Sequence, residues 1–319
     1  MSEILLWSVI FVLSLATLIT AARFFTVAAE VVGLAFGMSR FAVGVIIVAI
    51  GTSLPELIAA IVAVIKDASE IVAGNVIGAS VSNLFFVLAV AALFSKQTIQ
   101  LGDAYILIDL NYMMGAVFLL SLMMLDGTVT LSEGVLGLAA YLAYMFYLFR
   151  ESDTEKDILL DQPAEAGQAR STVSKKDVLI LVLSAVLIYF GANYTIEALE
   201  HVAEGIGVSK AIISVTVLSI GTTLPEVVVS ATAAMQDKGD IAVGNILGSC
   251  IFNSLAISGI ASIVGAIHVP PELLRLPLPV FAAGTLLFYL LASYKNISRW
   301  EGVLFLIIYI LFVLKVAGL

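Results

Sequence analysis

Cysteine, histidine and charge are all scarce in this sequence of 319 residues. It contains one cysteine, Cys250, and two histidines, His201 and His268. A single cysteine excludes an internal disulfide framework, and two histidines cannot build a histidine-rich metal site. Charged residues make up only 12% of the chain, against roughly 25% in a typical soluble domain. The net charge of −9, without a basic cluster, argues against nucleic acid as a partner.

Long apolar runs occupy most of the chain instead. Hydrophobic residues make up 61% of the sequence, more than one water-soluble core of this size can bury. A membrane-spanning helix needs about 20 apolar residues. The N-terminus lacks a basic n-region, so we expect the first span to be retained rather than cleaved as a signal peptide. We predict an all-α polytopic membrane protein with ten transmembrane helices, at residues 4–24, 41–65, 71–94, 104–125, 130–149, 178–198, 211–235, 241–266, 276–293 and 300–317.

One long polar segment, residues 150–177, separates five predicted spans from the other five. Its basic residues are Arg150, Lys156, Arg170, Lys175 and Lys176. Loops rich in lysine and arginine stay in the cytoplasm. We therefore expect this loop to be cytoplasmic and both termini to be extracellular, in the plasma membrane. The expected domains are a first repeat at 1–150, a linker at 151–177 and a second repeat at 178–319.

The short loops support the same orientation. Five basic residues fall on the predicted cytoplasmic side, namely Arg40, Lys96, Lys238, Lys295 and Arg299. Four fall on the other side, namely Lys66, Lys210, Arg275 and Lys315. The bias is moderate and agrees with the longer loop.

The two halves repeat each other at a constant offset. GMSRFAVGVIIVAIGTSLPE, ending at Glu56, matches GVSKAIISVTVLSIGTTLPE, ending at Glu226, and the offset is 226 − 56 = 170. IVAGNVIGASVSN at 71–83 matches IAVGNILGSCIFN at 241–253 with the same offset. Because each half has an odd number of spans, the second copy enters the membrane from the opposite face. Such inverted five-helix repeats, with interrupted helices and a midplane substrate site, recur in secondary transporters.

The motif GTSLPE places two helix-weakening residues just before a carboxylate. Proline removes a backbone donor and clashes with the carbonyl four residues earlier, which here belongs to Gly51. We therefore expect Pro55 to interrupt the helix and free carbonyls around Ala49, with the same arrangement around Ser219 in the second copy. In lipid such carbonyls need a substitute partner, and an ion is one.

Brought together, the two copies supply an all-oxygen site. Glu56 and Glu226 provide carboxylates, and no lysine or arginine stands in either motif to neutralise them. The neighbouring hydroxyls belong to Thr52, Ser53, Thr222 and Thr223. Calcium takes about six to eight oxygen ligands, whereas magnesium keeps its water and prefers strict octahedral geometry. A carboxylate at the centre of a spanning helix costs at least about 2.5 kcal/mol, so two copies of it indicate a cation site near the middle of the bilayer.

Asparagines follow each motif on the next predicted span. They are Asn75 and Asn83 in the first copy and Asn245 and Asn253 in the second. Residues eight apart lie on nearly the same helix face, so each pair is expected to point into the bundle. Asn83 and Asn253 either contact the ion or hold the glutamates in place, and the sequence leaves both roles open.

Glycines spaced four apart accompany these asparagines. They are Gly74, Gly78, Gly244 and Gly248. Small residues at this spacing allow membrane helices to pack closely, and we expect close packing at all four.

Three further acidic residues fall at the ends of predicted spans. Asp109 falls near the start of the fourth span, where we expect a solvated helix end. Glu30 and Glu200 match at the repeat offset and fall near the ends of the first and sixth spans. We interpret both as interfacial, with a role in gating left open.

GTSLPE followed by GN-x-x-G-x-x-x-x-N, found twice, resembles the alpha repeats of the calcium/cation antiporter superfamily. Within it, the chain resembles the prokaryotic sodium/calcium exchangers over the whole ten-span plan. The resemblance implies that the second, third, seventh and eighth spans surround the ions. It implies that Glu56 and Glu226 bind calcium, with Thr52 and Thr222 contributing. The sodium ligands that it implies are Ser53, Thr223, Ser249 and the carbonyls of Ala49 and Ser219.

Two residues depart from the family pattern. Ala79 stands at the first-copy position of Ser249 (249 − 170 = 79), so one hydroxyl common in the family is missing. Asn253 stands where some relatives have aspartate.

The 150–177 loop is also too short for the calcium-sensing domains of animal exchangers.

We therefore predict a sodium/calcium antiporter that works by alternating access, is not an enzyme and needs no cofactor. Its transported ions are Ca²⁺ and Na⁺. The alternative is a calcium/proton exchanger, which Ala79 favours because it removes a sodium ligand. A cation channel is less favoured, because most channels form pores by symmetry between subunits, and the motifs of intramembrane proteases are missing. Since one chain supplies both copies of the site, we expect the monomer to function.

Overall fold

The computed structural model describes residues 2–101, 108–160, 173–205 and 223–318, and most of them are helical. In chain order the helical elements are α1 (Ser2–Ala35), α2 (Arg40–Ala42), η1 (Val43–Val48), α3 (Ala49–Ile65), α4 (Glu70–Val81), η2 (Ser82–Val87), α5 (Leu88–Phe94), α6 (Leu110–Met124), α7 (Leu131–Leu160), α8 (Lys175–Gly205), α10 (Leu224–Met235), α11 (Gly239–Ile251), η4 (Phe252–Ile257), α12 (Ser258–Val264), α13 (Pro271–Arg275), α14 (Pro277–Ala292) and α15 (Arg299–Val316). The elements η1, η2 and η4 are π-helical turns.

The predicted fold class, a polytopic helical membrane protein, is confirmed. Among the described residues, seven helical segments are long and apolar enough to cross a membrane, and α6 and α10 are shorter apolar helices. The predicted span 211–235 is described only from Thr223 onward, because residues 206–222 lie outside the described part. The number ten therefore stays a prediction.

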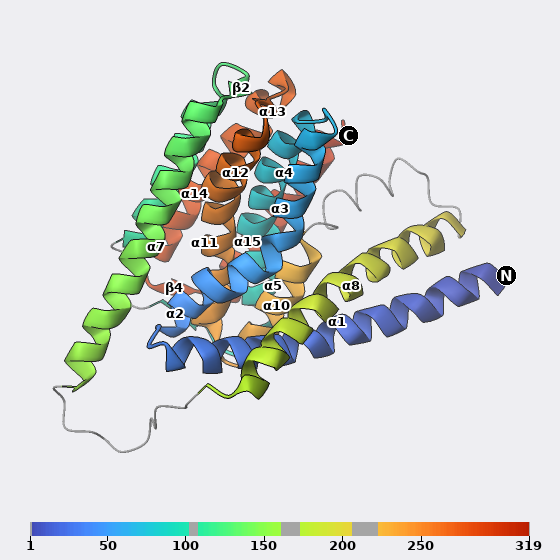
Figure 1. Ribbon diagram of the computed structural model, residues 1–319. Helices are drawn as coiled ribbons and strands as arrows, with labels where there is room; N and C mark the ends of the chain where they lie inside the picture. Colours follow the sequence, from blue (N-terminus) through green and yellow to red (C-terminus); the bar gives the residue numbers. More distant parts are fainter. Residues whose placement is uncertain (1, 102–107, 161–172, 206–222, 319) are drawn as a thin grey trace.

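Helices α1 and α8 are longer than the predicted spans 4–24 and 178–198. They have 34 and 31 residues, which corresponds to lengths of roughly 45–50 Å at about 1.5 Å per residue. Helix α1 continues past Arg23, which is exposed. The two helices pack along each other and are steeply inclined to the other helices (Figure 1). Such an inclination fits a long helix into a bilayer of about 30 Å.

The repeat predicted from the sequence is visible in the backbone. The π-helical turns η2 and η4 begin at Ser82 and Phe252, and 252 − 82 = 170. Each turn interrupts a long helix between an α-helical part before it and a shorter one after it. Because π-helical turns are rare, finding them at matching positions supports a structural duplication.

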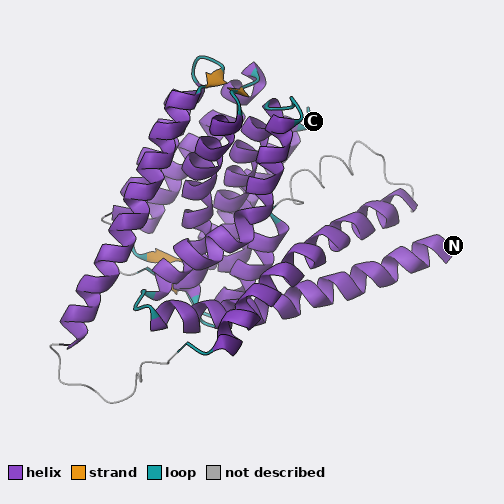
Figure 2. Ribbon diagram, viewed as in Figure 1, coloured by secondary structure: helices purple, strands orange, loops and turns teal. Residues whose placement is uncertain are grey.

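Two short antiparallel ribbons show that the repeats are inverted. Strand β1 (Ile99–Gln100) pairs with β4 (Asn296–Ile297), and β2 (Thr128–Val129) pairs with β3 (Ile267–His268). Strands β1 and β3 follow α5 and α12, which are repeat counterparts, yet the two ribbons lie at opposite ends of the bundle (Figure 2). The two halves therefore run through the bundle in opposite directions.

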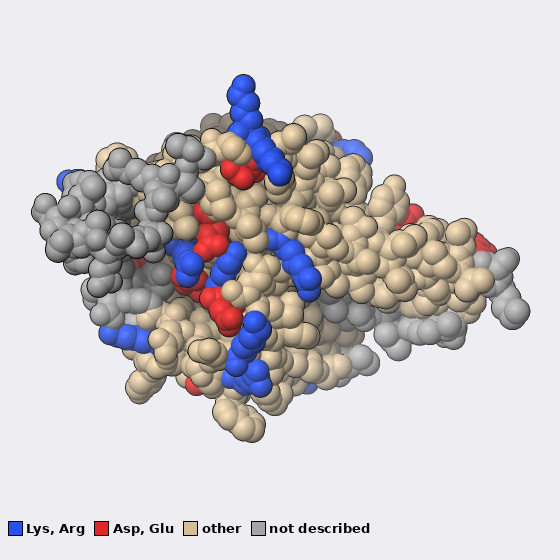
Figure 3. All heavy atoms as spheres, turned by 90° about the horizontal axis from the view of Figure 1, so that it is seen from below, with Lys and Arg blue, Asp and Glu red and all other residues tan. Residues whose placement is uncertain are grey.

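Charged side chains gather at the end of the bundle that carries β1 and β4 (Figure 3). Glu30 there forms two ion pairs of 2.7 Å, one with Arg40 and one with Lys238. The side chains of Glu30 and Lys238 are each only 13% exposed. Glu30 thus links the end of α1 to both α2 and the turn before α11. It was expected to be interfacial, and it also connects three segments of the bundle.

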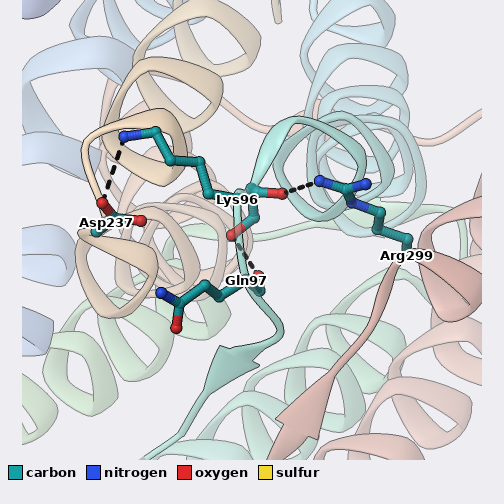
Figure 4. Close-up of polar contacts among 5 residues, drawn as sticks. Lys96, Gln97, Asp237 and Arg299 are labelled. Carbon is teal, nitrogen blue, oxygen red and sulfur yellow. Dashed lines mark hydrogen bonds and ion pairs between the residues drawn. The ribbon is translucent and has the colours of Figure 1, made fainter.

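Other contacts bring the predicted cytoplasmic residues to this same end. Lys96 lies 3.4 Å from Asp237, and the Arg299 guanidinium donates to the Ser95 carbonyl at 2.8 Å (Figure 4). The Ser95 hydroxyl in turn donates to the Gln97 carbonyl at 2.6 Å (Figure 4). The lower end of α7, which leads into the linker, lies on this side as well (Figure 1). This placement is consistent with the prediction that these basic residues lie on the same side of the membrane as the linker.

Asp109 does not lie at a solvated helix end, and that expectation was wrong. Its residue surface is only 1% exposed, and the Tyr144 hydroxyl donates to its carboxylate at 2.7 Å. Tyr112 stacks on Tyr144 with ring centroids 4.5 Å apart. The partner comes from α7, which packs against α6, so the sequence near Asp109 alone does not reveal it.

Candidate cation site

The two motif carboxylates lie inside the bundle on helices from opposite halves. Glu56 belongs to α3 and is 3% exposed, and Glu226 belongs to the first turn of α10 and is 1% exposed. Ser53, from the first copy, lies with its hydroxyl 3.2 Å from Glu226 Oε1. The two copies therefore meet directly, as the inverted repeat predicts.

Further predicted site residues come from α11 and from two π-helical turns, η2 and η4, which pack against α10 and α3. Ser249 of α11 lies with its hydroxyl 3.2 Å from that of Ser53. Asn83 and Asn253 lie within η2 and η4 and are each 1% exposed. Thr223, just before α10, is fully buried. A π-helical turn widens the helix by one residue, which is a common device at functional sites.

Four acceptor oxygens of this centre are buried without a hydrogen-bond partner among the described residues. They are Glu56 Oε2, Glu226 Oε2, Asn83 Oδ1 and Asn253 Oδ1. They form two repeat-related pairs, because 226 − 56 and 253 − 83 both equal 170. Leaving a buried polar atom unpaired costs about 1–3 kcal/mol, and more for a charged group. Buried acceptor oxygens left without a donor in both copies suit a ligand that accepts electron pairs, which is a cation.

The expected helix interruption at the first motif is not observed. Helix α3 continues from Ala49 to Ile65 with Pro55 inside it, and the irregularity lies one turn earlier, in η1. Proline still deprives the Gly51 carbonyl of its usual donor. The Thr52 hydroxyl lies 3.1 Å from the Val48 carbonyl and 3.3 Å from that of Ala49. The Thr52 hydroxyl thus contacts carbonyls of the preceding turn and not that of Gly51, and the helix continues through the proline.

The second copy differs at the corresponding place. Helix α10 begins at Leu224 with Pro225 in its first turn, where a missing backbone donor removes no helical bond. Ser219 and Thr222, the predicted ligands before this helix, lie outside the described residues.

Asn75 and Asn245 have different surroundings although they are repeat counterparts. Asn245 is fully buried, donates to the Ser230 hydroxyl at 2.8 Å and accepts from the Thr52 hydroxyl at 3.3 Å. Asn75 is only partly buried and lines a cavity of about 760 Å³ together with Glu56. The repeat comparison does not point to Ser230, because its first-copy counterpart is Ala60.

The glycine expectation is confirmed in the second copy. A Cβ on Gly244 would lie 2.5 Å from the Phe41 carbonyl oxygen, and one on Gly248 would lie 2.7 Å from Val45 Cα. Helix α11 therefore packs directly against α2 and η1. For Gly74 and Gly78, no described atom lies within 4 Å of an added Cβ. The first-copy glycines thus show no close packing among the described residues.

Comparisons with known proteins identify the family of this chain. The family model of the sodium/calcium exchanger protein family matches residues 6–150 and 176–317. The sodium/calcium exchanger MaX1 of Methanosarcina acetivorans is 30% identical, over 95% of this chain and 96% of its own length. The uncharacterized membrane protein MJ0091 of Methanocaldococcus jannaschii is 29% identical, over 94% of this chain and 95% of its own.

A solved structure is similar over almost the whole length. The sodium-calcium exchanger NCX_Mj, soaked with zero Na⁺ and Ca²⁺, matches with a TM-score of 0.82 and 27% identity. The match covers 98% of each chain. The two folds therefore agree across both halves and not only at the motifs.

Proposed function

The chain belongs to the sodium/calcium exchanger protein family, and on that premise we propose where and how it binds the ions that it exchanges. It exchanges Ca²⁺ for Na⁺ across the membrane in which its helices lie. The proposed calcium site is formed by Glu56 and Glu226, with Asn83 and Asn253 as further ligands. The single observation that carries this proposal is the set of four buried acceptor oxygens without a protein partner among the described residues.

The proposed sodium ligands are the hydroxyls and carbonyls around these carboxylates. Ser53 and Ser249 lie with their hydroxyls 3.2 Å apart, and Ser53 also lies beside Glu226. The further members of this proposed set are Thr223, the Ala49 carbonyl and, by the repeat offset, the Ser219 carbonyl. Thr52 and Thr222 are proposed to contribute to the calcium site. Neutral oxygens suit a monovalent ion, because its single charge needs less compensation than that of calcium.

The charge of the site fits an exchange of these two ions. Two ionised carboxylates and neutral amides give a charge of −2. No larger cluster, of three or more acidic, histidine or cysteine side chains that could hold a metal ion, occurs among the described residues. One Ca²⁺ or two Na⁺ cancel the charge of −2. Three Na⁺ leave a charge of +1, which would make the cycle electrogenic.

The proposed cycle alternates access between the two ends of the bundle. At the linker end, Gly244 and Gly248 contact α2 and η1, and Glu30 forms its two ion pairs. In the proposed cycle, this packing closes the site to the linker side. We propose that this packing separates when the site opens to the linker side.

The proposed orientation places the linker in the cytoplasm and both termini outside, in the plasma membrane. The proposed domains are the repeats 1–150 and 178–319, joined by the linker 151–177. The chain works as a monomer, because both halves of the site come from one chain. Lipid surrounds it, nucleic acid is no partner, and transport proceeds without a catalysed reaction or a cofactor.

Calcium uptake into proteoliposomes tests this function. Vesicles loaded with sodium and diluted into sodium-free medium, with pH clamped on both sides, should accumulate calcium. A proton gradient without sodium should not drive uptake. Uptake driven equally well by protons alone would support the calcium/proton alternative instead.

A further inference from the structure

Asn245 lies between the cation site and a serine that the repeat does not predict. Both residues are fully buried, on α11 and α10, and the amide nitrogen of Asn245 donates to the Ser230 hydroxyl at 2.8 Å. The amide oxygen accepts from the Thr52 hydroxyl of α3 at 3.3 Å. Asn245 thus has a protein partner at each end, unlike Asn83 and Asn253, whose amide oxygens have none among the described residues.

The position of Asn245 affects where the single hydroxyl hydrogen of Thr52 goes. Four acceptors compete for it, namely Asn245 Oδ1, the Val48 carbonyl and the Ala49 carbonyl, at 3.1–3.3 Å, and the Glu226 carboxylate. When the hydrogen goes to Asn245, the Ala49 carbonyl stays available to an ion. The hydroxyl oxygen of Thr52 then also offers its lone pairs to the site.

The first copy lacks this arrangement. The counterpart of Ser230 is Ala60, because 230 − 170 = 60, and alanine offers no hydroxyl. Asn75, the counterpart of Asn245, lines the cavity next to Glu56. Among the described residues, therefore, Asn245 is hydrogen-bonded to a serine and Asn75 is not.

From this geometry we infer that Ser230 is a positioning residue of the cation site. It holds the Asn245 amide so that its oxygen accepts from Thr52, and this keeps oxygens of the first motif available to sodium. Sodium depends on such neutral oxygens more than calcium does, because calcium is bound mainly by the two carboxylates. Ser230 thereby raises the affinity for sodium relative to calcium. The inference rests on the proposed function of this same site.

The first experiment measures ion binding to the purified protein. The melting temperature is followed against sodium and, separately, calcium concentration, since an ion that binds the folded state raises it. Ser230→Ala should raise the half-saturating sodium concentration about fivefold, the scale of one hydrogen bond, and change that for calcium much less. Ser230→Thr keeps the hydroxyl and should restore sodium binding.

Ser80→Ala is the matched control. Ser80 is also fully buried on a helix, but its hydroxyl donates to the Val76 carbonyl of its own helix at 2.7 Å. It should leave both ion titrations unchanged. An equal sodium shift in Ser80→Ala would overturn the inference, because any buried hydroxyl would then serve.

A double-mutant cycle tests whether Ser230 acts through Thr52. Thr52→Val removes the hydroxyl at nearly constant volume, and adding Ser230→Ala to it should weaken sodium binding no further. Additive losses, or a Ser230→Ala variant that binds sodium like the wild type, would overturn the inference. These outcomes would overturn only the role of Ser230. Failure of the proposed function would instead be seen as a lack of sodium-driven calcium uptake by the wild-type protein.

Discussion

Glu56 and Glu226 are buried carboxylates without a basic partner among the described residues. Removing one partner of a buried ion pair typically costs about 3–5 kcal/mol of folding stability, because the remaining buried charge is uncompensated. Here there are two such charges, and a divalent cation cancels both. In the proposed site, the same arrangement that destabilises the protein without an ion provides the affinity for calcium.

Ala79 offers a direct test of the sodium ligands. It is buried and lines the same cavity as Glu56, at the repeat position of Ser249. Ala79→Ser adds a hydroxyl worth on the order of 1 kcal/mol if it reaches the ion. Sodium inhibition of calcium uptake, measured at fixed pH, should then need a severalfold lower sodium concentration.

The calcium response provides the control for Ala79→Ser. The calcium concentration for half-maximal uptake should change little, because the carboxylates are untouched. Weaker sodium inhibition at unchanged calcium affinity would contradict the assignment of position 79 to the site.

Single site residues were predictable where both copies of the repeat contain them. Glu56 and Glu226 each keep the same motif, so the two carboxylates were expected to lie together. Ser230 has no counterpart hydroxyl, and no pattern in one sequence reveals that it contacts an amide 15 residues later. The pairing of Asp109 with Tyr144, 35 residues apart, depends on how α6 and α7 pack and was not predictable for the same reason.

At the scale of elements, the contact of α11 with α2 and η1 is set by backbone approaching backbone. The glycines there can be read from the sequence as small residues at a helical spacing. The helix against which they pack cannot be predicted from the sequence, because the spacing of the glycines does not identify the surface that they face. The π-helical turns were also not predicted, since the apolar pattern around them continues without a break.

Gly248→Ala tests this contact. The new Cβ would lie 2.7 Å from both Val45 Cα and the Val45 carbonyl oxygen, and backbone cannot move aside as a flexible side chain can. Overpacking of this kind costs about 1–3 kcal/mol, so the melting temperature of the purified protein should fall.

Gly115→Ala is the matched control in another helix. Gly115 lies in α6, and no described atom lies within 4 Å of an added Cβ. Alanine favours a helix over glycine by about 1 kcal/mol, so this variant should be as stable as the wild type or more so. Equal destabilisation by both substitutions would show that the α11 contact is not as close as described.

At the scale of the whole molecule, the inverted repeat fixes which loops share an end of the bundle. Arg40, Lys96, Lys238 and Arg299 all come to the end where α7 leads into the linker. The order and direction of the helices were predictable from an odd number of spans per half. The long inclined pair α1 and α8 was not, because hydropathy gives the length of an apolar run but not its tilt.

Thiol labelling tests the orientation. Cys250 is fully buried, so a single new cysteine can be placed against little background. A cysteine at Gln162 in the linker should not react with an impermeant reagent added to intact cells, whereas one at Ala317 should. The reverse pattern would place the linker outside the cell and overturn the orientation.

The central claim is that Glu56 and Glu226 bind the transported calcium, and sodium-driven calcium uptake in proteoliposomes tests it most directly. Glu56→Gln and Glu226→Gln each remove one charge with little change in volume, and each should abolish uptake in a protein that still folds. Glu70→Gln, at an exposed position in the first turn of α4, should transport like the wild type. Near wild-type uptake by either central variant would contradict the claim.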